Sequence, residues 1–324
     1  MSRLSSLADS KLFGVLATFV QVDVARLMSD VSFAAGDLVF RQGDRGDRLI
    51  LVGRGELEAV REVPGAHPVC LGSIVAGEIV GELSLLGDGV RTATVRASIP
   101  TTGWALPRAA FDVLRYDATP TASAVMHAIG NQAVQRLDRL YRRCAAEMKG
   151  APAARDSAAS SIGEVSPERG ELGYLAGILF FRDFTPEQIA QVTEGLPRLA
   201  VSRGALLTPA GEPPSALWVV VRGAVETKMR GTEATRSLRL AGPGRVVGQI
   251  GLLGPEAFVA GVESRARERS VLIEIPWPRV RELVADETPP SRRFAGALWT
   301  DVVRALQHGE RPLSRTRATT RVHV

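Results

Sequence analysis

The 324-residue chain has few of the side chains that build disulfide frameworks or metal sites: two cysteines and four histidines. Cys70 and Cys144 are too few for a disulfide framework, so we expect two reduced thiols. The histidines are scattered singly, without the short spacing that metal ligands show. We therefore predict neither a metal site nor a cofactor.

Long apolar runs are also missing. No stretch approaches the roughly 20 apolar residues of a membrane span, and Lys11 to Val24 lacks the order of basic, apolar and small residues that marks a signal peptide. The sequence shows no nucleophile beside a base, and no carboxylate pair that needs a catalytic explanation. We therefore expect a cytoplasmic protein without membrane contact, and an enzyme is the least favoured class.

The composition that remains is typical of a globular protein, with 45% hydrophobic and 23% charged residues. At about 150 residues a domain, the length predicts two domains, each able to bury a core. The net charge of +5 comes almost wholly from arginine, because Lys11, Lys149 and Lys228 are the only lysines. This bias can reflect base composition as much as function, so it does not by itself indicate a partner.

The segment 81–95 places Glu82 and Arg91 nine positions apart, across a glycine-punctuated turn. A carboxylate can accept a hydrogen bond from a ribose hydroxyl, and a planar guanidinium can grip two phosphate oxygens. Between them, Leu83 to Leu86 is long enough for one helical turn, whose free N–H groups would also face a phosphate. The pattern predicts a pocket for a small phosphate ester such as a cyclic nucleotide.

This segment resembles the phosphate-binding cassette of the cyclic-nucleotide-binding domain family, whose pattern runs from Gly-Glu through apolar and small residues to an Arg followed by a small residue, Ala and a β-branched pair. Residues 36–49 and 53–58, with their glycine-aspartate turns, are similar to the family's strand-turn-strand. The resemblance implies a jelly-roll barrel with helices at both ends, with Glu82 on the ribose hydroxyl and Arg91 on the cyclic phosphate. The ligand-binding residues that we predict are Gly81, Glu82, Leu83, Ser84, Arg91, Thr92, Leu140 and Tyr141.

Thr92 bears on the identity of the ligand. In eukaryotic members of the family, a threonine after the arginine goes with guanine preference because its hydroxyl can reach the guanine amino group. Bacterial members often break that rule. The breadth of the family leads us to favour cyclic AMP (cAMP), with cyclic GMP (cGMP) as the close alternative.

Residues 121–149 have apolar side chains at spacings of three to five, which predicts an amphipathic helix of about seven turns. The helix resembles the family's C-helix, which caps the base and, in the catabolite activator branch, forms a coiled dimer. Leu140 and Tyr141 fall near the positions that would close over the base, and Tyr141 suits stacking because its ring is amphipathic. The same two residues fit an ordinary core or the seam of a homodimer, so both interpretations stay open.

An internal repeat indicates the domain organisation. Residues 31–60 align with 199–228 at an offset of 168, and residues 81–95 align with 248–262 at an offset of 167. In the second copy Gln249 replaces the carboxylate and Phe258 replaces the arginine, so a buried phosphate would lack a counter-charge. We expect only the first copy to bind cyclic nucleotide, and the second to pack, dimerise or bind something apolar.

The fold class that follows is mainly β with flanking helices: two jelly-roll barrels joined by a long helix and a flexible linker. The expected boundaries are 1–149 for the first domain with its helix 121–149, 150–171 for the linker, 172–310 for the degenerate second domain, and 311–324 for a basic disordered tail. Near the start of the second domain, Thr185 and Gln188 fit a capping box around a helix whose first residue is Pro186.

The favoured function is a regulatory sensor, in which a cyclic nucleotide in the first barrel changes contacts with the second barrel or with an unknown protein effector. The tandem arrangement resembles a protein kinase A regulatory subunit in outline.

One alternative is a scaffold made of binding folds that no longer bind a ligand, against which the intact Glu82 and Arg91 argue. Another is a DNA-associated regulator of the catabolite activator type. A second barrel stands where its helix-turn-helix would follow, and four arginines in a tail do not by themselves favour nucleic acid.

Overall fold

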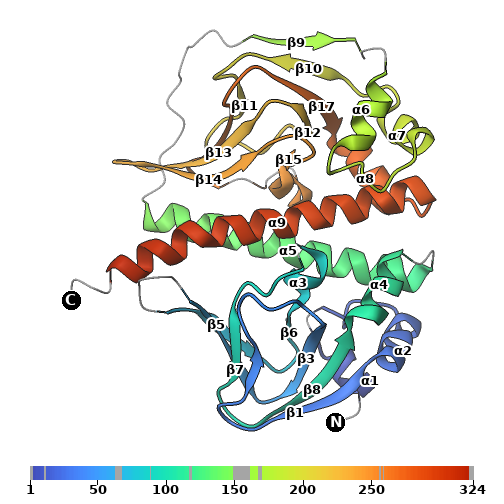
Figure 1. Cartoon of the computed structure of the whole chain (residues 1–324), viewed down its shortest axis with the longest axis vertical. Helices are drawn as coiled ribbons and strands as arrows, with labels where there is room; N and C mark the ends of the chain where they lie inside the picture. Colours follow the sequence, from blue (N-terminus) through green and yellow to red (C-terminus); the bar gives the residue numbers. More distant parts are fainter. Residues whose placement is uncertain are drawn as a thin grey trace. The chain divides into compact units, whose positions relative to one another are not determined.

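The computed structural model describes the chain except residues 1–2, 11, 63–67, 88, 117–118, 149–160, 167–169, 255–256, 258 and 321–324; of residues 3, 6, 115–116 and 308–320 only the backbone is described. The chain divides into two compact units (Figure 1). Unit 1 comprises residues 1–132 with 310–324, and unit 2 comprises residues 133–309. Each unit is mainly β with flanking helices, as the sequence predicts.

Unit 1 contains two antiparallel sheets of four strands, in the orders β1-β8-β3-β6 and β2-β7-β4-β5. The strands are β1 (Ser29–Phe33), β2 (Leu38–Phe40), β3 (Arg48–Arg54), β4 (Glu56–Arg61), β5 (Val69–Val75), β6 (Ile79–Val80), β7 (Thr94–Ala97) and β8 (Thr101–Pro107). The helices are α1 (Arg3–Ala8), α2 (Thr18–Leu27), α3 (Glu82–Leu86), α4 (Arg108–Tyr116) and the first part of α5 (Pro120–Glu147). Because Ile50 pairs with Val80, the start of β3 lies beside the start of α3.

Unit 2 repeats this plan with one additional strand. Its sheets have the orders β15-β12-β17-β10-β9 and β11-β16-β13-β14. The strands are β9 (Ile162–Val165), β10 (Arg198–Val201), β11 (Leu206–Thr208), β12 (Ala216–Arg222), β13 (Val225–Arg230), β14 (Thr235–Ala241), β15 (Val246–Val247), β16 (Val262–Ala266) and β17 (Ser270–Pro276). The helices are the second part of α5, α6 (Glu171–Gly177), α7 (Pro186–Thr193), the 3-10 helix η1 (Gln249–Leu253), α8 (Trp277–Ala285) and α9 (Pro289–Thr320), whose last residues belong to unit 1.

The two copies bury equivalent positions between their sheets. In unit 1, Ile50 and Leu57 belong to the core between the sheets. The repeat offset of 168 places Trp218 and Val225 at the same positions, and both are buried in the core of unit 2. Strand residues alternate between the two faces of a sheet, so apolar side chains at every second position form each core. The described strands thus form a jelly-roll-like pair of sheets in each unit rather than one closed barrel.

The local helix predictions are confirmed in two places. The long helix expected at 121–149 is α5, which spans Pro120–Glu147. The capping box is present at the start of α7: the Thr185 hydroxyl accepts a hydrogen bond from the backbone N–H of Gln188, and the Gln188 side chain accepts one from the N–H of Thr185. The division between the two compact units nevertheless falls within the sequence of α5, so the helix does not belong wholly to the first domain.

Two boundary predictions differ from the structure. The linker expected at 150–171 contains β9, whose Ile162 pairs with Val201 of β10, and Glu171 already begins α6. All four residues of β9 are exposed, so this edge strand relies on backbone pairing, which the composition of its side chains does not reveal. The tail expected to be disordered from residue 311 is helical as far as Thr320, because α9 continues through it; residues 321–324 lie outside the described residues.

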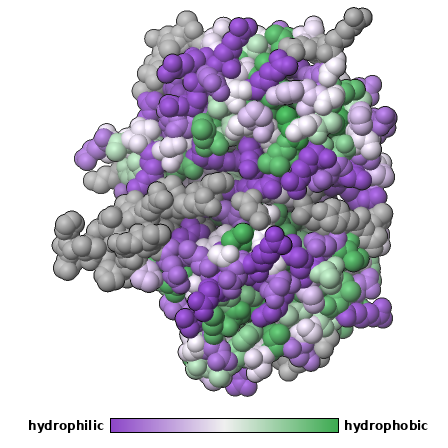
Figure 2. Space-filling model, viewed as in Figure 1, coloured by the Kyte–Doolittle hydropathy of each residue, from purple (hydrophilic) through white to green (hydrophobic). Residues whose placement is uncertain are grey.

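The surface of each unit is mixed in polarity. On the face shown in Figure 2, hydrophilic side chains are interspersed with hydrophobic ones in both units. None of the described helices combines the length and the apolar character needed to cross a membrane. Cys70 is exposed and Cys144 is buried, and the two thiols do not form a disulfide with each other. In the described part of the chain, no group of three or more His, Cys, Asp or Glu side chains could hold a metal ion.

Candidate functional site

Gly81 fixes the approach of the backbone at the predicted cassette of unit 1. It stands immediately before α3 with a φ of 97°, in the left-handed region that favours glycine. A Cβ at this position would lie 2.5 Å from Arg91 Nη1 and 2.9 Å from the carbonyl oxygen of Arg48. The close packing of a guanidinium and two backbone segments therefore depends on glycine here.

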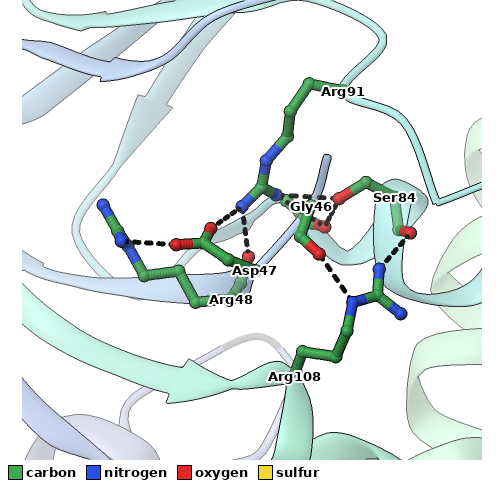
Figure 3. Close-up of polar contacts among 7 residues, drawn as sticks. Gly46, Asp47, Arg48, Ser84, Arg91 and Arg108 are labelled. Atoms are coloured by element: carbon green, nitrogen blue, oxygen red, sulfur yellow. Dashed lines mark hydrogen bonds and ion pairs between the residues drawn. The ribbon is translucent and has the colours of Figure 1, made fainter. Parts of the chain in front are cut away.

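Arg91 is the buried cation of this cassette, with 4% of its surface exposed. Its Nη1 donates to Ser84 Oγ at 2.8 Å and to the Gly81 carbonyl at 3.2 Å. Its Nη2 donates to Asp47 Oδ1 at 2.8 Å and to the Arg48 carbonyl at 2.7 Å (Figure 3). Burial lowers the pKa of Arg91 to about 10, which leaves the side chain cationic at neutral pH.

The ring of Phe40, at the end of β2, packs against the Arg91 guanidinium. The Arg91 Cζ atom lies 3.4 Å from the centre of the Phe40 ring, within the range of a cation–π contact. The Arg48 Cζ atom also faces this ring, at 5.7 Å. No local sequence pattern marks Phe40 as a site residue, because its nearness to Arg91 depends on how β2 and the cassette are brought together.

Asp47 connects two arginines at the site. Its Oδ1 accepts from Arg91 and its Oδ2 accepts from Arg48 Nη1 at 2.7 Å. The Asp47 side chain is 60% exposed, whereas that of Arg91 is 3% exposed. The glycine-aspartate turn that contains Asp47 was part of the family resemblance, but the pattern assigned no contact to this side chain.

Arg108, the first residue of α4, contacts both the turn at Gly46 and the cassette at Ser84. Its Nε donates to the Gly46 carbonyl at 2.6 Å and its Nη2 to the Ser84 carbonyl at 2.9 Å (Figure 3). Ser84 thus accepts from Arg91 through its hydroxyl and from Arg108 through its backbone. This chain of contacts connects the cassette directly to the helix that follows the last strand of the unit.

The structure brings together most of the predicted site residues of the first copy. Gly81, Glu82, Leu83 and Ser84 form the start of α3, and two of them accept hydrogen bonds from Arg91. Glu82 is buried, with 3% exposure, at the first position of this short helix. Thr92 is half-buried, and its carbonyl accepts a hydrogen bond from Arg61 Nε at 3.3 Å.

Leu140 and Tyr141 lie in the part of α5 that belongs to unit 2, and both are buried. Burial raises the pKa of Tyr141 to about 12, with Arg239 opposing and Asp301 adding to the shift. Arg239 and Asp301, the charged residues that shift the pKa of Tyr141, therefore both belong to unit 2. That Leu140 and Tyr141 close over a base in the first copy stays a prediction.

The second copy keeps the backbone of the cassette but has different side-chain contacts. Gly248 precedes η1 with a φ of 95°, and a Cβ there would lie 2.6 Å from the Ala216 carbonyl, the position equivalent to Arg48. Gln249 donates to the Val246 carbonyl at 2.9 Å and to Asp301 Oδ2 at 3.1 Å. Phe258, the residue at the arginine position, lies outside the described residues.

Comparison with protein families agrees with the repeat. The model of the cyclic nucleotide-binding domain matches residues 30–115 and again residues 198–287, which together exceed half of the chain. The chain belongs to the cyclic nucleotide-binding domain family. The two matched regions contain the two cassettes, so this is a tandem cyclic-nucleotide-binding protein, and the matched regions are binding domains.

Two relatives are named for cyclic-nucleotide-dependent protein kinases. The chain is 25% identical over 253 residues to a cGMP-dependent protein kinase, egl-4, of Caenorhabditis briggsae, covering 78% of this chain and 27% of the kinase. It is 34% identical over 115 residues to a cAMP-dependent protein kinase regulatory subunit of Blastocladiella emersonii, covering 36% of this chain and 28% of that subunit. The chain thus spans about a quarter of the length of these relatives.

Two solved structures match the chain at low TM-scores. The regulatory domain of Toxoplasma gondii PKA, crystallised with cAMP, matches at 18% identity over 88% of this chain and 92% of that chain, with a TM-score of 0.34. A cyclic nucleotide-binding domain from Methylobacillus flagellatus matches at 25% identity over 45% of this chain and 82% of that chain, with a TM-score of 0.40. Membership of the family rests on the two model matches and not on these scores.

Proposed function

We propose that this chain is a cyclic-nucleotide-responsive regulatory protein whose first copy binds the ligand. The observation that carries the proposal is the buried Arg91 guanidinium, held beside the N-terminal turn of α3 by backbone carbonyls, Ser84 and Asp47. A desolvated guanidinium with its planar fork of donors suits a monoanionic phosphate. Glu82, buried at the start of the same helix, supplies the carboxylate for a ribose hydroxyl.

The ligand that we favour is cAMP, with cGMP as the alternative. Thr92 would allow a hydroxyl contact to a guanine amino group, which keeps cGMP in consideration. Among the relatives, the egl-4 kinase is named for cGMP, and the Toxoplasma regulatory domain was crystallised with cAMP. The relatives therefore represent both ligands, and a titration with each has to decide between them.

The second copy is assigned a packing or partner-contact role, and the output is assigned to a protein effector. A homodimer through residues 121–149 receives no added support, because the apolar side chains of α5 are already buried within the chain. These side chains are Val125, Ile129, Val134, Leu137, Leu140 and Tyr141. A dimer formed through the same face would have to replace this packing.

The test is calorimetric titration of the full chain with cAMP and cGMP, with Arg91→Lys and Glu82→Gln as variants. Arg91→Lys keeps a positive charge but removes the planar fork, and Glu82→Gln installs the side chain of the second copy. Hydrogen bonds to charged groups contribute about 1.5–3 kcal/mol each, so Arg91→Lys should weaken binding at least about tenfold. One ligand should bind per chain.

Arg96→Ala is the matched control, because Arg96 is an exposed arginine on β7 with one long contact, from Nη1 to the Gly36 carbonyl at 3.5 Å. It should leave the affinity unchanged. Equal affinity of Arg91→Lys and the native chain would rule out the assigned phosphate contact. Two ligands per chain would rule out the passive role of the second copy.

A further inference from the structure

A buried ion pair lies directly against the second cassette. Asp301, in the middle of α9, and Arg239, on β14, have side chains that are 4% and 5% exposed. Arg239 Nη2 donates to Asp301 Oδ1 at 2.9 Å and to Oδ2 at 2.7 Å. The two residues are 62 positions apart in sequence, so the contact fastens α9 to the sheet.

The Asp301 carboxylate is also bound by the cassette itself. Gln249, the first residue of η1, donates its amide to Asp301 Oδ2 at 3.1 Å. The backbone N–H of Val246 donates to the same oxygen at 3.4 Å. Arg245 adds an ion pair at 3.7 Å to Oδ1. Donors from β14, β15 and η1 therefore converge on one carboxylate, as they would on a bound anion.

The substitutions that distinguish the two copies fit this arrangement. At position 249 a carboxylate, as at Glu82 in the first copy, would place a second negative charge against Asp301 in a buried setting. Glutamine instead offers a neutral donor. The repeat places Arg239 opposite Leu71 or Gly72, neither of which is cationic, so the guanidinium is particular to the second copy.

We propose that the second copy has rebuilt an anion-binding site from Arg239, Gln249 and the Val246 N–H, and that the chain's own Asp301 occupies it. The internal carboxylate provides the charge that a ligand would otherwise bring, and it holds α9 on unit 2 in the absence of any small molecule. The anion-binding site of the second copy is then always filled by a side chain of the same chain, and its conformation is fixed. This inference does not depend on ligand binding in the first copy.

The first test is chemical rescue of Asp301→Ala in the full chain. Removing the carboxylate leaves Arg239 buried without its counter-ion, which is strongly destabilising. Hydrogen exchange followed by mass spectrometry should show faster exchange in residues 289–307 of α9 and in β14, with unit 1 unchanged. Added formate should slow this exchange again, whereas chloride at equal ionic strength should not, because only a carboxylate matches the vacated donors.

Two variants sharpen the rescue. Asp301→Asn fills the space with a neutral side chain, so it should lose protection in α9 and show no response to formate. Asp183→Asn is the control, because Asp183 forms an exposed ion pair with Arg182 at 3.6 Å, and it should behave as the native chain. Unchanged exchange in Asp301→Ala, or an equal response to formate and chloride, would overturn the proposal.

A charge exchange keeps the proposal testable where Asp301→Ala fails to fold. Gln249→Glu should accelerate exchange in α9, because it sets two carboxylates against each other. The double variant Gln249→Glu with Asp301→Asn moves the negative charge to the cassette and restores a donor–acceptor pair, so it should recover much of the lost protection. If the effects of the two substitutions on exchange are additive, Gln249 and Asp301 do not interact, and the proposal is wrong.

Discussion

The two cassettes differ most in where the negative charge beside them comes from. In unit 1 the buried Arg91 has an exposed carboxylate partner in Asp47. In unit 2 the negative charge is the buried Asp301, which reaches the cassette from α9. An exposed partner can exchange with a dissolved anion, whereas a buried partner that also fastens a helix cannot do so without moving that helix. The same backbone therefore has an exposed, exchangeable charge partner in one copy and a buried, fixed one in the other.

The largest effect that we expect concerns Tyr141, which lies beside the ion pair of unit 2. Its pKa is raised to about 12 from an ordinary value of 10, chiefly by burial. The folded state thus favours the protonated phenol, so this contribution to stability is complete below pH 10 and is lost as the pH rises through 12. Two pKa units correspond to at most about 3 kcal/mol.

This loss of stability is measured by chemical denaturation of the native chain and of Tyr141→Phe. The measurements run from about pH 8 to about pH 11, because the loss begins at roughly pH 10. The free energy of unfolding of the native chain should fall more steeply above pH 10 than that of the variant. Parallel curves would show that Tyr141 ionises as easily in the folded chain as in the unfolded one. The ion pair of unit 2 would then lack the tightly buried surroundings that distinguish it from the ion pair of Arg91 and Asp47 in unit 1.

Gly81→Ala and Gly248→Ala form a matched pair across the two copies. Both glycines have a positive φ, 97° and 95°, and both would place a Cβ against a backbone carbonyl. Each substitution should destabilise its unit by about 1–3 kcal/mol. Only Gly81→Ala also presses on Arg91 Nη1, so only this variant should weaken cyclic-nucleotide binding.

Calorimetric titration together with thermal unfolding separates these outcomes. Gly248→Ala should lower the unfolding temperature and leave the affinity of the remaining folded protein unchanged. Loss of affinity in both variants would indicate that the two cassettes act together. The contrast between an exchangeable charge partner in unit 1 and a fixed one in unit 2 would then fail.

Residues close in sequence were the ones that the sequence could predict. Glu82 and Arg91 lie nine positions apart within one motif, and the structure places them on one short helix and the loop after it. Phe40 reaches Arg91 through the pairing of β2 with β7, and Asp47 reaches it through backbone hydrogen bonds between residues 43–46 and 89–91. A single sequence does not specify such long-range pairing at the level of side chains.

The contacts of unit 2 show the same limit more strongly. Arg239 and Asp301 carry no local pattern that joins a strand residue to a helix residue 62 positions later. The loss of Glu and Arg from the second cassette was visible, and it suggested a silent copy. The carboxylate that lies against the second cassette is Asp301, and only the fold brings it there, by placing α9 against η1. The strand β9 likewise depends on pairing with β10, which is distant in sequence.

The smallest expected effect is that of Asp47→Asn, which tests whether the partner of Arg91 is exchangeable. The Asp47 carboxylate of this ion pair is 60% exposed and screened by water, so it contributes at most about 1 kcal/mol to stability, and the unfolding free energy should change little. The affinity for cyclic nucleotide should rise by less than about tenfold, because a negative charge that competes for Arg91 Nη2 is removed. The hydrogen bonds from Arg91 to the Arg48 and Gly81 carbonyls and to Ser84 keep the guanidinium in place in this variant.

Calorimetric titration at low and high salt measures the change, and Asp37→Asn, at an exposed turn before β2, is the control. A marked fall in affinity would mean that Asp47 positions Arg91 for the ligand, and that its carboxylate, like Asp301, is a fixed part of the site.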